Sequence, residues 1–368
     1  MARTGKAVIC RELNKPVVVE PVSVDAPKRG EVTVKIAACG VCHSDLSATN
    51  GTIALPPPLV LGHEAAGEVI EVGEGVTGLA VGDHVVSSFI YMCGRCRFCA
   101  AGRPVLCIEQ GKALTTPPEG TPRVKDAAGK PLGIFSGCGV MAEYATLSVD
   151  NLVRIDPKIP LDRAALVGCA VTTGVGAVFN TAKVEPGSSV AVFGCGGVGL
   201  NVVQGAAIAG AERIIAIDTL PEKLEMAKRF GATDTVLAKP GEDTAKTLKK
   251  MTGGGPDYAF ECVGAGALAE TAYRAIRRGG KAVIVGVARP TESTAFKPMT
   301  MVFEEKTLQG SYFGSSVPRI DFPKMLQLYM AGRLKLDELI THRYKIDEAP
   351  RAFADLESGR NARGVIVF

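Results

Sequence analysis

The stretch Ser189-Val190-Ala191-Val192-Phe193-Gly194-Cys195-Gly196-Gly197-Val198-Gly199 decides how the second half of the chain folds. A short apolar run leads into a G-x-G-x-x-G pattern, and the Ala-rich segment 197–209 that follows is typical of a helix. Asp218 closes the next apolar run, 19 residues after Gly199. The glycine pattern alone is weak evidence in a chain with 43 glycines, but this context predicts a dinucleotide-binding loop.

The glycine loop and Asp218 together predict a bound NAD rather than NADP. The predicted cofactor contacts of the loop are Gly194, Gly196, Gly197, Val198 and Gly199. Glycines permit a tight turn and close approach of the backbone to a pyrophosphate, and the helix N-terminus attracts the phosphates. Asp218 would bind the adenosine ribose diol and would repel a 2′-phosphate by about 1–4 kcal/mol. No Arg follows within four residues to relieve that repulsion. The alternative interpretation is a tight turn without a ligand.

Strand and helix patterns alternate from about 171 to 311. Six short strands are predicted, at 189–193, 213–217, 235–237, 257–262, 281–286 and 307–312. Helical segments fill four of the gaps, at 197–209, 221–230, 242–251 and 267–277. This rhythm predicts a parallel sheet covered on both faces.

The first 150 residues consist instead of short alternating apolar runs separated by turn residues, which predicts an antiparallel barrel or sandwich. Residues 108–140 have few periodic apolar positions, so we expect an extended surface insertion there. The tail from 313 to 368 contains two amphipathic helical segments and a last strand at 364–367. We expect this tail to rejoin the first domain.

Composition excludes several classes of protein. Hydrophobic residues make up 46% and charged residues 22% of the 368 residues, which is typical of a globular chain. The net charge of +4 is too small and dispersed for a nucleic-acid or membrane surface. The sequence contains no run of 18 apolar residues, so no membrane span is predicted. Charged residues follow the N-terminus too closely for the apolar region of a secretory signal. We therefore expect a cytoplasmic protein, in which the 11 cysteines serve thiolate chemistry rather than disulfides.

Four cysteines lie within fifteen residues, at Cys93, Cys96, Cys99 and Cys107. Random placement gives on the order of 0.0003 such matches, so the spacing is a strong signal. Four thiolates around one ion match a closed tetrahedral zinc site, which has no open position for chemistry. The predicted role is structural: the metal orders a lobe that has little core of its own.

A second set, Cys42, His63 and Cys169, is weaker by spacing. Each residue taken singly is more often a small buried residue or a core histidine. Together they form a Cys2His set, the three-ligand type that leaves a fourth zinc position for water or substrate. The spacing cannot show that the three converge.

The chain resembles the zinc-containing alcohol dehydrogenases of the medium-chain dehydrogenase/reductase superfamily over essentially its whole length, in the long-loop branch related to class I and class III enzymes. The motifs that carry the resemblance are Gly-Val-Cys-His-Ser-Asp at 40–45, Gly-His-Glu-Ala-Ala-Gly at 62–67, the four-Cys lobe, Gly-Cys-Ala-Val-Thr-Thr-Gly at 168–174, the loop at 194–199 with Asp218, and Asn-Ala-Arg-Gly-Val-Ile at 361–366. The resemblance implies a mainly β GroES-like catalytic domain at 1–170 and 312–368, with the structural zinc lobe at about 93–107. It also implies a Rossmann NAD-binding domain at 171–311, with the active-site cleft between the two.

The resemblance also implies a role for each matching residue. Cys42, His63 and Cys169 match the catalytic zinc ligands, Asp45 the carboxylate that orients the ligand histidine, Glu64 the acid behind the zinc, and Ser44 the first hydroxyl of a proton relay. The matching cofactor contacts are His43 and Arg363 for the pyrophosphate, Lys223 for the adenosine ribose and Thr173 for the nicotinamide. Val287 is a further predicted cofactor contact, in the same pocket as the substrate residues. Phe89 and Ile53 match the substrate pocket. The chain departs from several family members at Ser47, where they end the relay with a histidine, so the group that ends the relay is left open.

These expectations describe an NAD-dependent alcohol dehydrogenase with two zinc ions per chain, one catalytic and one structural. Its reaction would be reversible hydride transfer between a primary alcohol or its aldehyde and NAD. A polyol or secondary-alcohol dehydrogenase of the same fold is the alternative among enzymes. A zinc-stabilised NAD(H)-sensing or structural protein is the alternative outside enzymes. We expect a homodimer or homotetramer, because the predicted sheet ends in an unpaired edge strand at 307–312.

Overall fold

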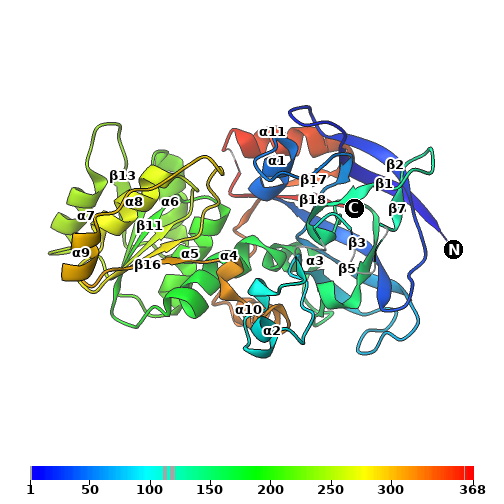
Figure 1. Cartoon of the computed structure of the whole chain (residues 1–368), viewed down its shortest axis with the longest axis horizontal. Helices are drawn as coiled ribbons and strands as arrows, with labels where there is room; N and C mark the ends of the chain where they lie inside the picture. The colour runs from blue at the N-terminus through cyan, green and yellow to red at the C-terminus, as the bar shows by residue number, and fades with distance from the viewer. Residues whose placement is uncertain (1, 111–113, 117–119, 121, 360) are drawn as a thin grey trace. The chain divides into compact units, whose positions relative to one another are not determined.

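The computed structural model describes residues 2–110, 114–116, 120, 122–359 and 361–368. The chain divides into two compact units. Unit 1 comprises Met1–Cys169, Val317–Gly332 and Leu336–Phe368, and unit 2 comprises Ala170–Ser316 with Arg333–Lys335. The elements of both are labelled in Figure 1.

Unit 2 contains a six-stranded, wholly parallel sheet in the order β13-β12-β11-β14-β15-β16. Its strands are β11 (Ser189–Phe193), β12 (Arg213–Asp218), β13 (Asp234–Leu237), β14 (Tyr258–Glu261), β15 (Lys281–Ile284) and β16 (Thr307–Gly310). Its helices are α4 (Ala170–Gly176), which continues as a π-helical turn to Ala182, α5 (Gly197–Ile208), α6 (Pro221–Arg229), α7 (Thr244–Met251), α8 (Gly266–Ala275) and α9 (Pro298–Phe303). All six predicted strands and the four predicted helices are present, whereas α9 was not expected.

The order of these strands reverses next to β11. Strand β11 lies in the middle of the sheet with all but its first residue buried, as a strand covered on both faces requires. The chain moves from β11 to β12 and β13 on one side and then returns to β14 on the other. Parallel sheets bind ligands at the carboxyl ends of their strands where the order reverses in this way. That position lies between β11 and β14.

The described residues of unit 1 form two sheets, which are mainly antiparallel. The five-stranded sheet comprises β7 (Val124–Lys125), β2 (Val18–Val24), β1 (Arg3–Cys10), β4 (Leu59–Val60) and β8 (Gly133–Ile134). The larger sheet comprises β10 (Leu152–Arg154), β6 (His84–Ser87), β5 (Ala65–Val72), β3 (Glu31–Val41), β18 (Arg363–Val367) and β17 (Ile340–Lys345), with β9 (Tyr144–Ser148) also paired to β3. The C-terminal strand β18 thus pairs with β3, more than 300 residues earlier in the chain.

The expectation of a surface insertion at 108–140 is wrong for its described second half. Residues 124, 132, 134, 135 and 138 are buried hydrophobic positions, and strands β7 and β8 join the smaller sheet. The Arg123 guanidinium donates to both carboxylate oxygens of Glu31 over 2.9 and 2.7 Å, and both residues are buried. Residues 111–113, 117–119 and 121 lie outside the described part.

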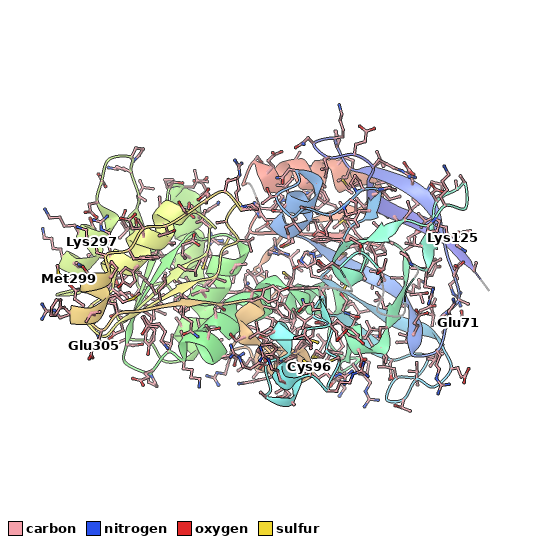
Figure 2. The ribbon with its side chains drawn as sticks, in the orientation of Figure 1. Glu71, Cys96, Lys125, Lys297, Met299 and Glu305 are labelled. Atoms are coloured by element: carbon pink, nitrogen blue, oxygen red, sulfur yellow. The ribbon has the colours of Figure 1, made fainter. Side chains whose placement is uncertain are left out.

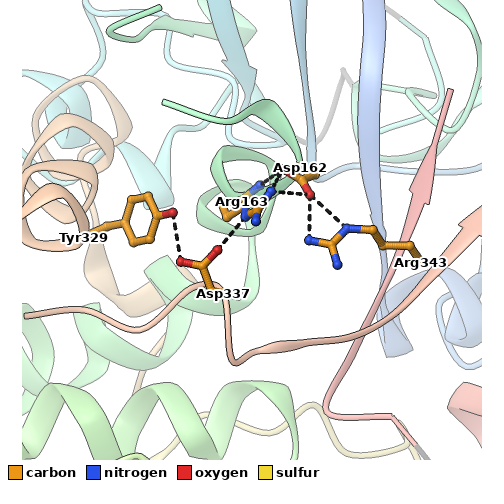
Figure 3. Close-up of polar contacts among 5 residues, drawn as sticks. All are labelled: Asp162, Arg163, Tyr329, Asp337 and Arg343. Atoms are coloured by element: carbon orange, nitrogen blue, oxygen red, sulfur yellow. Dashed lines mark hydrogen bonds and ion pairs between the residues drawn. The ribbon is translucent and has the colours of Figure 1, made fainter. Parts of the chain in front are cut away.

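A polar network joins residues 162 and 163 to the C-terminal segments of unit 1 (Figure 3). Arg163 in helix α3 (Leu161–Ala165) donates to Asp337 over 2.7 Å, and the Tyr329 hydroxyl of helix α10 (Pro318–Met330) donates to the same carboxylate over 3.0 Å. Asp162 accepts two hydrogen bonds from the Arg343 guanidinium. The network therefore fixes α10 and β17 to α3, which ends four residues before Cys169. Helix α11 (Ala349–Glu357) completes this unit.

Within the described residues, no single helix is both long and apolar enough to cross a membrane, although the bent pair Leu161–Gly168 and Ala170–Ala182 passes that test jointly on length and composition.

Candidate zinc and cofactor sites

Unit 1 brings Cys42, His63 and Cys169 together, together with Glu64. One ligand atom from each of the four lies within 4.8 Å of those of the others, and all four residues are buried. The Cys42 and Cys169 sulfurs are 4.0 Å apart. Two thiolates at about 2.3 Å from one tetrahedral zinc ion would be roughly 3.8 Å apart, so the separation fits a shared metal.

Glycines allow the ligands to approach one another. Cys42 lies between β3 and helix α1 (His43–Thr49), and His63 lies between β4 and β5. Gly62 has a φ of +90°, and a Cβ there would collide with the Met141 backbone nitrogen. A Cβ at Gly168 would lie 2.9 Å from the Ser87 carbonyl oxygen and 3.1 Å from the Glu64 Cα. Any side chain at these glycines would push the loops that carry His63 and Cys169 apart.

Asp45 orients the histidine. This carboxylate is fully buried; its Oδ1 accepts a hydrogen bond from the Gly62 backbone N–H over 2.8 Å, and its Oδ2 lies 3.3 Å from His63 Nδ1. Because Nδ1 faces the carboxylate, Nε2 is the nitrogen left to bind a metal. Nε2 is buried and has no hydrogen-bond partner among the described residues. A buried nitrogen without a partner is costly unless an ion occupies the site.

The thiol and the imidazole shift each other's protonation. The pKa of Cys42 lies well below its ordinary value, chiefly because it is hydrogen-bonded with Cys169, and despite burial. Burial lowers the pKa of His63, but the charge of Asp45 and the contacts with Asp45 and Cys42 outweigh it and raise that pKa to about 10. Both shifts favour the charged forms of the pair, the thiolate and the imidazolium. The thiolate is the form that binds zinc.

Two aromatic rings enclose His63. Phe89 and Phe135 each pack edge-on against the imidazole, with ring centroids 5.4 and 5.3 Å from it. Phe89 and Ile53 are partly buried and pack against the apolar core of unit 1 that contains Phe135. Phe135 was not predicted, because it lies in the segment that we had interpreted as a surface insertion.

Two further predicted residues lie beside this cluster. The Arg363 guanidinium forms an ion pair with Glu64, and both are buried. The Ser44 hydroxyl lies 3.7 Å from the Cys42 sulfur. His43 is the first residue of α1, and its role as a pyrophosphate contact, like that of Arg363, stays a prediction.

The four-cysteine set forms a second cluster in unit 1, where Cys93, Cys96, Cys99 and Cys107 also lie within 4.8 Å of one another. The Cys99 backbone N–H donates to the Cys96 sulfur over 3.5 Å, and this bond is the largest cause that lowers the pKa of Cys96 to about 6. Cys96, which is labelled in Figure 2, caps the N-terminus of helix α2 (Arg97–Ala100). Four sulfurs fill a tetrahedral site, so this cluster fits a structural zinc ion.

Unit 2 contains the predicted glycine loop. Gly194 has a φ of +89°, and a Cβ at Gly199 would collide with the Gly194 carbonyl oxygen. A Cβ at Gly196 would meet nothing within 4 Å, which leaves the backbone open to a ligand. Asp218 ends β12, and its Oδ2 accepts a hydrogen bond from the Cys195 N–H over 2.8 Å. The carboxylate thus already holds the loop that it was predicted to serve.

The remaining predicted contacts are spread over unit 2. Thr173 lies in α4, Val198 and Lys223 lie in the first turns of α5 and α6, and Val287 lies just beyond β15, where 71% of it is exposed. Their roles as cofactor contacts stay predictions.

A parallel nucleotide-binding sheet in one unit, and a closed and an open metal cluster in the other, define a zinc-dependent dehydrogenase of two units. Residues 28–157 match the family model described as the alcohol dehydrogenase GroES-like domain, and residues 197–331 match that of the zinc-binding dehydrogenases. The chain belongs to the family of zinc-containing alcohol dehydrogenases.

Proteins of known activity and structure resemble the whole chain. An S-(hydroxymethyl)glutathione dehydrogenase of Synechocystis sp. is 41% identical over 98% of this chain and 99% of its own. The crystal structure of an alcohol dehydrogenase zinc-binding domain protein from Burkholderia ambifaria has a TM-score of 0.95, 35% identity and full coverage of both chains. That of benzyl alcohol dehydrogenase from Acinetobacter calcoaceticus has a TM-score of 0.91 and 31% identity, and covers 100% of this chain and 99% of its own. The predicted fold class, family and zinc-dependent alcohol dehydrogenase activity are confirmed.

Proposed function

We propose that this enzyme transfers hydride reversibly between primary alcohols that carry an apolar or aromatic substituent and NAD+. Cys42, His63 and Cys169 are the proposed ligands of the catalytic zinc. The observation that carries this proposal is the buried His63 Nε2, which has no hydrogen-bond partner among the described residues although His63 clusters with Cys42 and Cys169.

The residues of the chain have distinct tasks in this proposal. When bound, zinc is the Lewis acid that makes loss of the alcohol's hydroxyl proton accessible near neutral pH. Asp45 keeps His63 in the tautomer whose Nε2 is free to bind the metal. Ser44, whose hydroxyl lies 3.7 Å from the Cys42 sulfur, accepts the proton and passes it on. With Ser47 in place of a relay histidine, we propose that water receives it.

The surroundings of His63 support an apolar substituent. The rings of Phe89 and Phe135 pack on the imidazole, and Ile53 adds an aliphatic side chain to the same core. S-(hydroxymethyl)glutathione, the substrate named for the Synechocystis relative, carries two carboxylates and an ammonium group at neutral pH. The segment 50–58, which contains Ile53, has no charged residue to pair with them.

The activity test compares benzyl alcohol with S-(hydroxymethyl)glutathione, each with NAD+, by the appearance of NADH absorbance. We expect the higher kcat/KM with benzyl alcohol, and loss of turnover with both after zinc is removed by chelation. A higher kcat/KM with S-(hydroxymethyl)glutathione would favour that second function, which the 41% identical relative supports. Turnover that survives chelation of both metals would refute the zinc mechanism.

We also infer that the cofactor is NAD rather than NADP. Asp218 lies at the end of β12, where a ribose bound to the glycine loop would extend, and its charge opposes a 2′-phosphate. The thiolate clusters require a reducing compartment, which supports the cytoplasm as the site of action.

A homodimer is the proposed assembly. Helix α9 exposes Met299, Val302 and Phe303, of which 69%, 70% and 77% are accessible. Figure 2 labels Met299 with its neighbours Lys297 and Glu305. Among the described residues, strand β16 has a partner on one side only, so it also offers an edge to a second copy. We expect Phe303→Lys to shift the mass in light scattering toward the monomer, and an unchanged mass would contradict this assembly.

A further inference from the structure

A cleft of about 620 Å³ lies among the helices of unit 2. Its walls come from α7, from α8 and from the segment 295–306, which contains α9. All three helices are labelled in Figure 1. A cleft of this volume has the size that encloses small organic ligands.

This cleft is distinct from the sites already described. One of its lining residues, Lys306, immediately precedes β16 and so lies at the amino end of that strand. The glycine loop instead follows the carboxyl end of β11. The described residues that line the cleft include none of the predicted cofactor contacts and none of the apolar side chains that α9 offers to a second copy.

Two aromatic rings line the cleft, and one of them carries a hydroxyl group without a partner. Tyr273 is 3% exposed, and Phe296 packs edge-on against it with the ring centroids 5.0 Å apart. The Tyr273 hydroxyl is buried and has no hydrogen-bond partner among the described residues. Because tyrosine normally finds a partner when it is buried, this hydroxyl points to a ligand that accepts a hydrogen bond.

A buried ion pair lies beside the tyrosine. The Lys306 side chain is 2% exposed, and its ammonium group lies 2.6 Å from a Glu304 carboxylate oxygen and 5.7 Å from the centre of the Tyr273 ring. Burial and the charge of Glu304 raise the pKa of Tyr273. The hydroxyl therefore stays protonated and can donate a hydrogen bond.

The other charges of the cleft are mainly positive. Arg274 is already paired with Asp243 over 2.7 Å. Three exposed lysines line the cleft and have no ion pair within 4.0 Å among the described residues, namely Lys246, Lys249 and Lys297, the last of which is labelled in Figure 2. Glu270 is the one lining acid that is likewise unpaired in the described part of the chain. Three such cations and one such anion leave an excess of two positive charges.

We propose that this cleft binds a phosphorylated small molecule that carries an aromatic ring. Lysine binds phosphate as a point charge, and a phosphate ester carries about −1.5 to −2 near pH 7, which matches the excess of positive charge. The Tyr273 hydroxyl donates to a phosphate oxygen, and the partly exposed Phe296 ring packs against the ring of the ligand. This inference goes beyond the proposed function and does not depend on it.

The test measures the binding of phenyl phosphate to the zinc-loaded full chain by titration calorimetry, with NADH present at saturation. Bound NADH occupies the pyrophosphate site at the glycine loop and so excludes the probe from it. We expect saturable binding with a Kd below about 1 mM. Inorganic phosphate, which lacks the ring, should bind at least about threefold more weakly.

Two substitutions with matched controls locate the site. Tyr273→Phe removes only the hydroxyl, and it should weaken binding of phenyl phosphate by about tenfold or more, whereas Tyr258→Phe, outside the cleft, should not change it. Lys249→Gln should weaken binding by about threefold. Lys250→Gln should leave it unchanged, because Lys250 is an exposed residue of the same helix that does not line the cleft.

The melting temperature separates ligand binding from folding. Because the Tyr273 hydroxyl has no partner within the chain, Tyr273→Phe should not lower the melting temperature in the absence of phenyl phosphate. Phenyl phosphate should raise the melting temperature of the wild type by more than that of the variant.

Four results would each overturn the inference. They are no saturable binding to the wild type, equal affinity for inorganic phosphate, binding that neither Tyr273→Phe nor Lys249→Gln weakens, and a lower melting temperature of unliganded Tyr273→Phe. The third result would place the probe elsewhere on the chain, for example in the substrate pocket. Turnover of benzyl alcohol, measured on the same samples, tests the proposed function separately.

Discussion

Replacement of Asp45 by Asn should release the catalytic zinc while leaving the structural zinc in place. Asp45 Oδ2 lies 3.3 Å from His63 Nδ1, and Oδ1 accepts the Gly62 N–H. In Asp45→Asn, the amide oxygen can still accept from Gly62, which turns the amide NH2 toward Nδ1. The imidazole must then accept at Nδ1 and carry its proton on Nε2, the atom that should bind zinc.

The size of the effect follows from this change of tautomer. Removal of a partner that orients a ligand histidine costs about 10–100-fold in metal affinity, or about 1.4–2.7 kcal/mol. Asp45 and His63 are both buried, so water cannot replace the lost acceptor. We therefore expect the upper part of that range. The fold should survive, because the hydrogen bond to Gly62 is retained.

The assay is zinc content per chain after dialysis against a graded series of chelator concentrations, with NADH production measured on the same samples. The structural zinc should leave the wild type and the variant at the same chelator concentration. The catalytic zinc should leave the variant at a lower chelator concentration than the wild type. The four-cysteine cluster is the internal control, since it contains neither Asp45 nor His63. If Asp45→Asn holds both ions as tightly as the wild type and keeps its activity, the proposed role of this carboxylate is refuted.

Three other predictions concern metal binding, cofactor choice and stability. Cys42→Ala should abolish turnover with little change in melting temperature, whereas Cys96→Ala should lower the melting temperature; equal melting temperatures of the two zinc-loaded variants would contradict the structural assignment of the four-cysteine cluster. Asp218→Ala should raise the KM for NAD and narrow its advantage over NADP, because the repulsion of about 1–4 kcal/mol is removed; steady-state kinetics with both cofactors measure this, and an unchanged preference would count against the ribose contact. Arg123→Ala should lower the free energy of unfolding by about 3–5 kcal/mol, because Glu31 would be left as a buried charge without its partner. Urea unfolding of Arg123→Ala beside Arg333→Ala, an exposed control, checks the last prediction, and similar midpoints would disprove it.

Some features of the site gave no signal in the sequence. Phe135 packs on His63 from a segment without periodic apolar positions. The chain around Phe135 is irregular rather than a long helix or strand, so its buried residues follow no regular spacing. Tyr273 resembles any buried position of helix α8 until its hydroxyl is seen to have no partner among the described residues. Helix α9 is only six residues long and presents no buried face, so no periodicity distinguished it.

The sequence by itself determined the features that depend on neighbours along the chain. These are the glycine loop between β11 and α5, the alternation of strands and helices, and the four-cysteine cluster, whose ligands are close in sequence and so must be close in space. Only the tertiary structure decided the features that depend on distant segments. The convergence of Cys42 and His63 with Cys169, which are 127 and 106 residues apart from it, follows from strand pairing and from glycines that allow loops to touch. Spacing along a chain fixes local geometry, whereas contacts between remote segments depend on how the whole core packs.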